Sequence, residues 1–123
     1  MAAPQILIAE DEEQLRGLIA EMLTERHVNV VEAADGVEAF ALLQSHPGVS
    51  LLLSDVKMPR MNGYELVEQA LALHPELKVL MMTGYAQDHP PSAVLRAREI
   101  RTLIKPVDLN RLCDLACEML ARP

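Results

Sequence analysis

Short apolar runs alternate with segments of helical periodicity along the chain, and this alternation limits the fold more than any other feature. The apolar runs, each a predicted strand, are residues 5–9, 29–33, 49–54, 77–82 and 102–104. Predicted helices follow them over residues 15–23, 37–43, 64–71, 93–98 and about 108–121. This order predicts an α/β fold with a parallel sheet, because right-handed crossovers place helices on both faces. Since half of the 123 residues are apolar, we expect one domain over residues 1–123 with its core at about 5–121.

The charge balance and the hydropathy pattern argue against several classes of protein. Eleven basic and eighteen acidic residues give a net charge of −7, which disfavours direct binding to nucleic acid. No apolar run approaches the roughly 20 residues of a membrane span, and the first four residues do not begin a signal peptide. Cys113 and Cys117 lie four apart in a helical segment, which fits buried thiols better than a disulfide scaffold. We therefore expect a soluble, cytoplasmic protein without membrane insertion.

Polar side chains that carry chemistry follow four of the five predicted strands. They are Glu10 and Asp11 after the first strand, Asp55 after the third, Thr83 after the fourth and Lys105 after the fifth. In open α/β sheets the functional site lies outside the carboxyl ends of the strands. The sequence therefore predicts that three carboxylates, one hydroxyl and one ammonium group converge at this edge.

Such a group of side chains suits phosphoryl transfer assisted by a divalent metal ion. Three crowded acids raise one another's pKa unless a cation offsets them, and oxygen ligands suit Mg²⁺. A carboxylate such as Asp55 can form an aspartyl-phosphate. The metal ion, Lys105 and the Thr83 hydroxyl can then neutralise charge on the transferred group.

Each of these residues also has an ordinary structural interpretation. Acids such as those at 10–13 are common at a solvated helix N-terminus, and Glu12 and Glu13 fit that interpretation. A lone Asp after a strand is usually a turn or cap residue, and a Lys-Pro pair usually belongs to a loop. The functional hypothesis depends on the conjunction of such residues at four strand ends of one predicted sheet.

The segments around these residues resemble the receiver domain of response regulators, over residues 6–120. The resembling segments are residues 6–12, 53–59 with Asn62-Gly63, 82–86 and 103–107. The resemblance implies a flavodoxin-like, doubly wound sheet of five parallel strands in the order 2-1-3-4-5 with five helices. It also implies a receiver domain of a two-component phosphorelay. We expect no output domain in this chain, because the fifth predicted helix reaches almost to its last residue.

The resemblance assigns a role to each candidate residue. Asp55 would be the phosphoacceptor, and Thr83 and Lys105 would contact the phosphoryl group. Glu10, Asp11, Asp55 and the main-chain carbonyl of Lys57 would hold Mg²⁺ or Mn²⁺, Glu10 partly through water. The peptide bond before Pro106 would be cis.

Two positions depart from the pattern of the family. Glu10 stands where aspartate is commonest, a change that lengthens the side chain and that we expect to retain its charge and metal binding. Thr102 stands where the family usually has Tyr or Phe as a rotameric switch, so the usual aromatic readout is in doubt. Tyr85 is a candidate for part of that role, and a partly exposed loop tyrosine is an equal alternative.

Three functions compete for this sequence. The leading hypothesis is a phosphoacceptor switch, not a turnover enzyme, that is phosphorylated by a histidine kinase or histidine phosphotransfer protein. It would act on a downstream protein through the face from strand four to helix five. A pseudo-receiver that binds proteins without phosphorylation is the alternative, against which the retention of Asp55, Thr83 and Lys105 argues. An aspartyl-phosphate hydrolase of the haloacid dehalogenase type would need a second acid at position 57, which is Lys57.

Overall fold

The protein is described here from a computed structural model, which defines residues 5–84 and 100–122. Five strands and four helices lie in these ranges. In chain order they are β1 (Ile6–Ala9), α1 (Glu13–Glu25), β2 (Val30–Ala33), α2 (Gly36–Ser45), β3 (Leu51–Asp55), α3 (Gly63–Leu73), β4 (Lys78–Thr83), β5 (Arg101–Ile104) and α5 (Leu109–Ala121). The helix expected over residues 93–98 lies outside the described residues.

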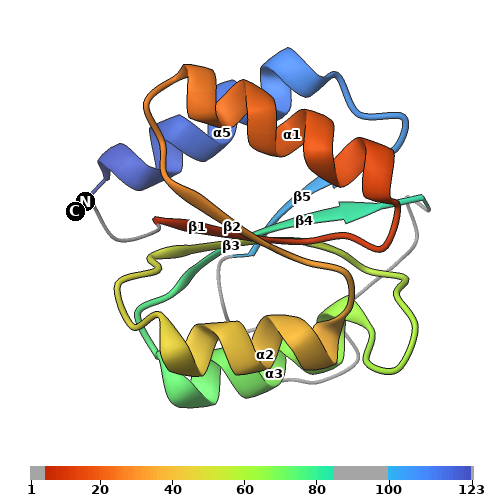
Figure 1. The fold of residues 1–123 in the computed structure, drawn as a ribbon, viewed down its shortest axis with the longest axis vertical. Coiled ribbons are helices and arrows are strands. Elements are labelled where there is room, and N and C mark those ends of the chain that lie inside the picture. Colours follow the sequence, from red (N-terminus) through yellow and green to blue (C-terminus); the bar gives the residue numbers. More distant parts are fainter. Residues whose placement is uncertain (1–4, 85–99, 123) are drawn as a thin grey trace.

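The strands form one parallel sheet in the order β2-β1-β3-β4-β5. Helices α1 and α5 cover one face, and α2 and α3 cover the other (Figure 1). The doubly wound arrangement and the strand order are as predicted. The predicted strand limits differ from the observed ones by one or two residues, with the largest shift at β3, which begins at Leu51 and not at residue 49. Such shifts are usual at strand ends and leave Asp55 as the last residue of β3.

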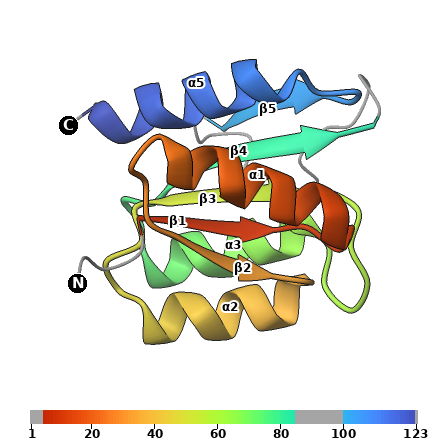
Figure 2. The same cartoon turned by 45° about the horizontal axis from the view of Figure 1, so that its top comes forward.

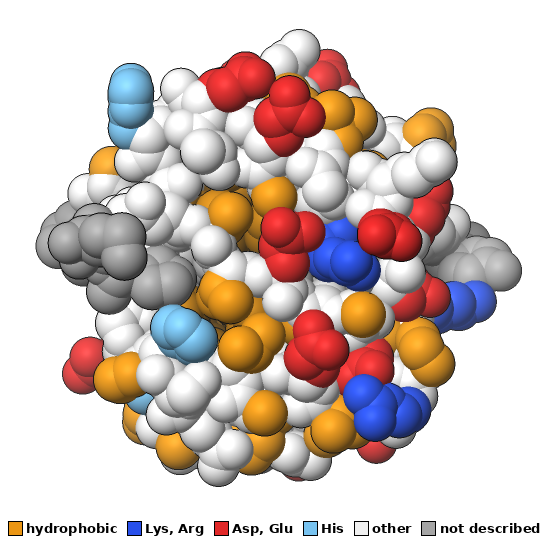
Figure 3. All heavy atoms as spheres, in the orientation of Figure 1, with side chains coloured by type: hydrophobic (Ala, Val, Ile, Leu, Met, Phe, Trp, Pro, Cys, Tyr) orange, Lys and Arg blue, Asp and Glu red, His pale blue; other side chains and the backbone are white. Residues whose placement is uncertain are grey.

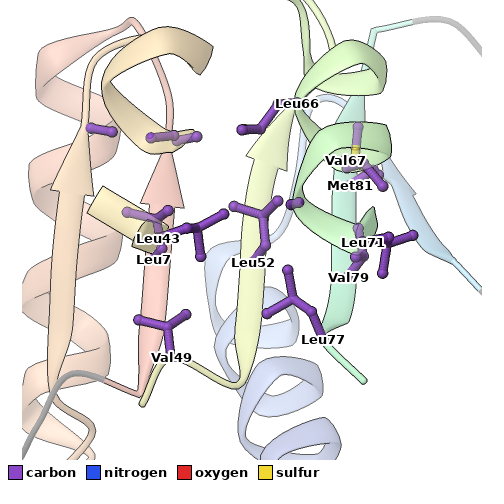
Figure 4. Packing of buried hydrophobic residues seen from close by; sticks show 14 of the residues in the cluster. Leu7, Leu43, Val49, Leu52, Leu66, Val67, Leu71, Leu77, Val79 and Met81 are labelled. Carbon is purple, nitrogen blue, oxygen red and sulfur yellow. The ribbon is translucent and has the colours of Figure 1, made fainter. Parts of the chain in front are cut away.

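Alternate residues of the central strands face opposite helical layers, because side chains of a strand alternate between the two sides of a sheet. Figure 4 shows the layer on the side of α2 and α3, where Leu7, Leu52 and Val79 pack against helical residues such as Leu43 and Leu71. On the other side, strand residues such as Ile8 and Leu53 pack against residues of α1 and α5. Burial on both faces explains why β1, β3 and β4 are almost entirely apolar.

Polar side chains begin three of the helices at defined residues. The Asp35 carboxylate accepts a hydrogen bond from the Glu38 amide at the start of α2. Asn62 and Glu65 form a reciprocal capping box at the start of α3. Asp108 accepts from the amides of the first turn of α5, as the sequence predicted. These caps set where α2 and α3 start, and therefore where the loops before them must end.

The described surface is rich in acidic groups. On the face drawn in Figure 3, acidic side chains outnumber basic ones, in keeping with the net charge of −7. Cys113 is buried and Cys117 half-buried, and both are free thiols. Within residues 5–84 and 100–122, no helix has the length and apolar character needed to cross a membrane.

Candidate functional site at the carboxyl edge of the sheet

The register of the parallel strands brings the predicted residues together. Ala9 pairs with Ser54, so the next residues, Glu10 just beyond β1 and Asp55 at the end of β3, lie side by side. Asp55 pairs in turn with Met82 of β4, one residue before Thr83. The strands all point toward the same edge of the sheet (Figure 2). This edge is where the sequence placed the candidate site.

Three carboxylates form the centre of this edge. One oxygen from each of Glu10, Asp11 and Asp55 lies within 4.8 Å of the other two. Glu10 is fully buried and Asp55 is 6% exposed, whereas Asp11 is exposed. The cluster therefore has two acids inside the protein and one at its surface.

Burial makes Glu10 an unusual carboxyl group. Its Oε2 is buried and has no hydrogen-bond partner among the described residues. Burial, followed by the hydrogen bond that a protonated Glu10 would donate to Asp55 and by the charge of Asp55, raises the pKa of Glu10 to about 8. A protonated Glu10 can donate to Asp55, which gives the orphaned carboxyl a partner. In the protein without a bound cation, this raised pKa favours the neutral form of Glu10, and the expectation that Glu10 keeps its charge and binds metal stays a prediction. Burial is the main cause, and crowding of the acids is secondary.

Lys105 is the basic side chain of the cluster. Its Nζ lies 2.8 Å from Asp55 Oδ2 and 3.5 Å from Glu10 Oε1. Partial burial acts to lower the pKa of Lys105. The hydrogen bonds with Asp55 and Glu10 and the negative charges of both residues outweigh burial, so the pKa is raised. The main chain of Lys105 is fixed as well, because its amide donates to the Thr83 carbonyl over 2.7 Å. The peptide bond from Lys105 to Pro106 is cis, as the resemblance implied.

The remaining predicted residues occupy different environments around this centre. Thr83 is 2% exposed at the end of β4, and Lys57 is exposed in the loop after β3. Thr102 is exposed on β5. Tyr85 lies outside the described residues, so its proposed share in the switch stays a prediction.

The loop between β3 and α3 is docked onto the start of α2, a feature that the sequence reasoning missed. Arg60, with a left-handed backbone (φ 66°), donates from Nε to Asp35 Oδ2 over 2.9 Å. A Cβ on Gly36 would lie 2.5 Å from the Met61 carbonyl oxygen, so this close approach requires glycine. The available signal was an Asx-Gly pair at two helix starts, Asp35-Gly36 and Asn62-Gly63.

Replacing Asp35 with Asn should reduce the free energy of unfolding by about 1 kcal/mol near neutral pH, because Asn keeps the cap but loses the ion pair with Arg60. The Glu38 amide and then Arg60 hold the pKa of Asp35 below its ordinary value, against the effect of burial. A lowered pKa stabilises the fold above the unfolded-state pKa of about 4, and this contribution disappears as the pH falls through the folded-state pKa. The difference in the free energy of unfolding between wild type and Asp35→Asn, measured with urea, should therefore shrink as the pH falls from about 5 to about 3.

Asp35→Ala, which also loses the cap, should be less stable than Asp35→Asn at neutral pH. Equal stability of the two variants would contradict this account.

Comparison with known proteins identifies the family of this site. The family model described as the response regulator receiver domain matches residues 6–116. The chain belongs to the response regulator receiver family. The response regulator receiver protein CpdR of Brucella abortus is 35% identical over 118 residues, which cover 94% of this chain and 96% of that protein. The sensor kinase CckA of the same organism is 34% identical, but the matched part is only 12% of its length.

Solved receiver structures share the fold. A CheY-like receiver domain from Methanospirillum hungatei JF-1 has a TM-score of 0.85 and 31% identity, with 97% of this chain and 94% of that chain covered. The receiver domain from the hybrid histidine kinase CckA has a TM-score of 0.79 and 31% identity, with 94% and 98% covered. The likeness thus extends over nearly the whole of this receiver domain, including all four strand ends of the site.

Proposed function

We propose that this receiver domain accepts a phosphoryl group on Asp55 from a phosphohistidine of a histidine kinase or histidine phosphotransfer protein. The observation that carries the proposal is the setting of Asp55, whose Oδ2 lies 2.8 Å from Lys105 Nζ and beside two further carboxylates. An Asp55 oxygen would form a bond to phosphorus while the bond from phosphorus to the histidine nitrogen breaks. The nitrogen would keep the electron pair of that bond.

The acidic cluster fits a divalent cation. Glu10, Asp11 and Asp55 supply only oxygen ligands, and the buried Oε2 of Glu10 has no donor among residues 5–84 and 100–122 that would satisfy it as a carboxylate. In this proposal these three residues and the main-chain carbonyl of Lys57 hold Mg²⁺ or Mn²⁺. When bound, the cation would offset negative charge on Asp55 and on the phosphoryl oxygens.

Lys105 and Thr83 complete the proposed site. Lys105 Nζ contacts Asp55 and is positioned to pair with a phosphoryl oxygen once one is attached there. The Thr83 hydroxyl, at the end of the neighbouring strand, can donate to another phosphoryl oxygen. Because the phosphoryl group stays on the side chain of the protein itself, we propose a signalling switch and not a turnover enzyme.

A hollow lies beside Lys105. Its volume is about 280 Å³, and its lining includes Leu15 of α1 together with Val107 and Leu109 near the start of α5. An apolar lining next to a cation suits a partner that brings both a hydrophobic contact and a phosphate. We propose that the histidine-bearing partner contacts this hollow, because Lys105, which contacts Asp55, is among its lining residues.

The proposed output surface extends from β4 to α5. Thr102 and Ile104 of β5 are exposed, and Ile104 is 53% exposed despite its apolar side chain. Attachment of a phosphoryl group would draw Thr83 and Lys105 toward Asp55 and so displace the ends of both strands. A downstream protein that binds this face would then distinguish the two states. Because Thr102 is short, the switch would depend on Thr83 and the chain after it more than on a side chain of β5.

Incubation with a small phosphodonor and Mg²⁺ should add the mass of one phosphoryl group to the wild-type protein and none to Asp55→Asn. Asn is close to Asp in size but lacks the nucleophilic carboxylate, so the expected loss is complete. Intact-mass spectrometry measures the outcome directly. Asp114→Asn, which changes an exposed carboxylate of α5, is the matched control and should be phosphorylated like wild type. A wild type that gains no mass, or an Asp55→Asn variant that gains as much as wild type, would contradict the proposal. The first result would favour a pseudo-receiver.

A further inference from the structure

We propose that Arg16 is a positioning residue for the metal site, which it serves by holding the main chain of the acidic turn after β1. This inference rests on the proposed function, because it concerns the same three carboxylates. Arg16 lies in the first turns of α1, and its side chain is only 17% exposed. From there its Nη1 donates to the Glu10 carbonyl over 2.9 Å, and its Nε donates to Glu32 Oε1 over 3.3 Å.

A hydrogen bond to the Glu10 carbonyl can fix the positions of two of the proposed metal ligands. It belongs to the peptide that joins Glu10 to Asp11, so its direction fixes how the two acids leave the main chain. The Glu10 amide is held as well, because it donates to the Ala33 carbonyl over 3.1 Å. Glu32 immediately precedes Ala33 on β2. Arg16 and the sheet therefore attach both sides of Glu10 to the same end of one strand.

A guanidinium group suits this task better than an ammonium group. Its planar set of N–H donors can reach a carbonyl and a carboxylate at the same time in a fixed geometry. The two hydrogen bonds also differ in exposure, since the Glu32 side chain is 42% exposed whereas Glu10 as a whole residue is fully buried. The bond to Glu10 is thus the better protected of the two, and Glu32 mainly orients the guanidinium toward it.

The charge of Arg16 and its positioning role have opposite effects on metal binding. Removing a nearby cation would, through charge alone, strengthen the binding of a divalent cation to three carboxylates. Releasing the peptide between Glu10 and Asp11 would weaken that binding, because the ligands would have to be ordered when the cation arrives. The sign of the change in affinity therefore separates the two effects.

The test is a titration with Mg²⁺ that is monitored through amide NMR shifts, at a temperature where every variant is folded. Arg16→Met should raise the dissociation constant roughly tenfold, and Arg16→Lys should fall between Arg16→Met and wild type. Without metal, the Glu10 and Asp11 amides should exchange hydrogen faster in Arg16→Met than in wild type. Glu32→Gln keeps the contact with Glu10 and should stay within about twofold of wild type.

Arg26→Met is the matched control for charge and stability. Arg26 is the C-cap residue of the same helix and forms an ion pair with Asp114 of α5, so the variant also loses one cation and one ion pair. Its Mg²⁺ affinity should equal or exceed that of wild type. Unchanged or tighter binding by Arg16→Met would overturn the role of Arg16 while leaving the proposed function intact. A wild type that binds no Mg²⁺ would overturn both.

Discussion

Replacing Glu10 with Gln is expected to stabilise the metal-free receiver domain at about pH 8, by on the order of 3 kcal/mol, and to remove a pH dependence that wild type shows. The pKa of Glu10 is about 8 in the folded protein, against 4.5 for an ordinary glutamate. Between these values the folded protein holds a proton that the unfolded chain has released. Wild-type stability should therefore fall as the pH rises from about 4.5 to about 8. Gln, which stays neutral, should show no such fall.

Chemical unfolding at several pH values, without divalent cations, measures this effect. Glu10→Gln and wild type should be nearly equal in stability at about pH 5 and diverge toward about pH 8. Glu12→Gln is the matched control, because Glu12 is exposed and lies outside the three-carboxylate cluster. It should follow wild type within about 0.5 kcal/mol at every pH. A constant difference between wild type and Glu10→Gln across this range would show that Glu10 is charged in the folded protein.

The same substitution should weaken Mg²⁺ binding at least tenfold, because an amide oxygen replaces a carboxylate oxygen in the proposed ligand set. In wild type, the affinity for Mg²⁺ should rise with pH up to about 8, since the cation competes with the proton on Glu10. Phosphorylation of Asp55 would then depend on pH through Glu10. Calorimetric titration at two pH values distinguishes this from a site whose acids are all ionised beforehand.

The sequence was enough to predict that Glu10, Asp11, Asp55 and Lys105 lie close together. The reasoning for Glu10, Asp55 and Lys105 needed only the limits of the strands and the rule that parallel strands end at one edge. The strand register brings Glu10 and Asp55 close together, because Ala9 and Ser54 are partners in the sheet and the two acids are the next residues. A shift of one or two residues in the predicted start of β3 did not matter, since the end of that strand carries the chemistry.

The sequence could not show how deeply each side chain would lie. Glu10 and Asp11 are adjacent in the chain, yet Glu10 is fully buried and Asp11 is exposed. This difference arises from the position of β1 between β2 and β3, which encloses the first side chain after the strand. Arg16 posed a similar problem, because its contact with the Glu10 carbonyl spans an irregular turn that no periodicity describes. Depth and turn geometry depend on three-dimensional packing, which a pattern of apolar residues does not specify.

Two glycines illustrate the same limit for the backbone. Gly36 and Gly63 are the first residues of α2 and α3, and each follows an Asx cap. The sequence marks both as turns. Only the structure shows that each is pressed against a main-chain carbonyl, of Met61 for Gly36 and of Asp55 for Gly63. The second contact concerns the proposed phosphoacceptor itself.

Gly63→Ala is therefore expected to destabilise the protein by about 3 kcal/mol and to slow phosphorylation of Asp55 at least tenfold. A Cβ at this position would lie 2.2 Å from the Asp55 carbonyl oxygen and 3.0 Å from its carbonyl carbon. Neither atom is the end of a flexible side chain, so the end of β3 or the start of α3 must move. The Gly63 amide also donates to the Val56 carbonyl over 2.7 Å, which ties the helix start to the same strand end. Movement there would displace the Asp55 carboxylate from Lys105.

Two other glycines separate loss of stability from loss of site geometry. Gly36→Ala should also destabilise, because its Cβ would lie 2.5 Å from the Met61 oxygen, but it should leave the phosphorylation rate of the folded protein closer to that of wild type. A Cβ added at Gly17, inside α1, would meet nothing within 4 Å. Gly17→Ala should therefore stabilise the protein by about 0.5–1 kcal/mol, which makes it a suitable background for both variants.

Urea unfolding gives the stabilities, and the time course of phosphorylation in the Gly17→Ala background gives the rates. If Gly36→Ala and Gly63→Ala slow phosphorylation equally, the effect comes from general loosening of the loop. If only Gly63→Ala slows it, the contact between Gly63 and the Asp55 carbonyl sets the geometry of the phosphoacceptor.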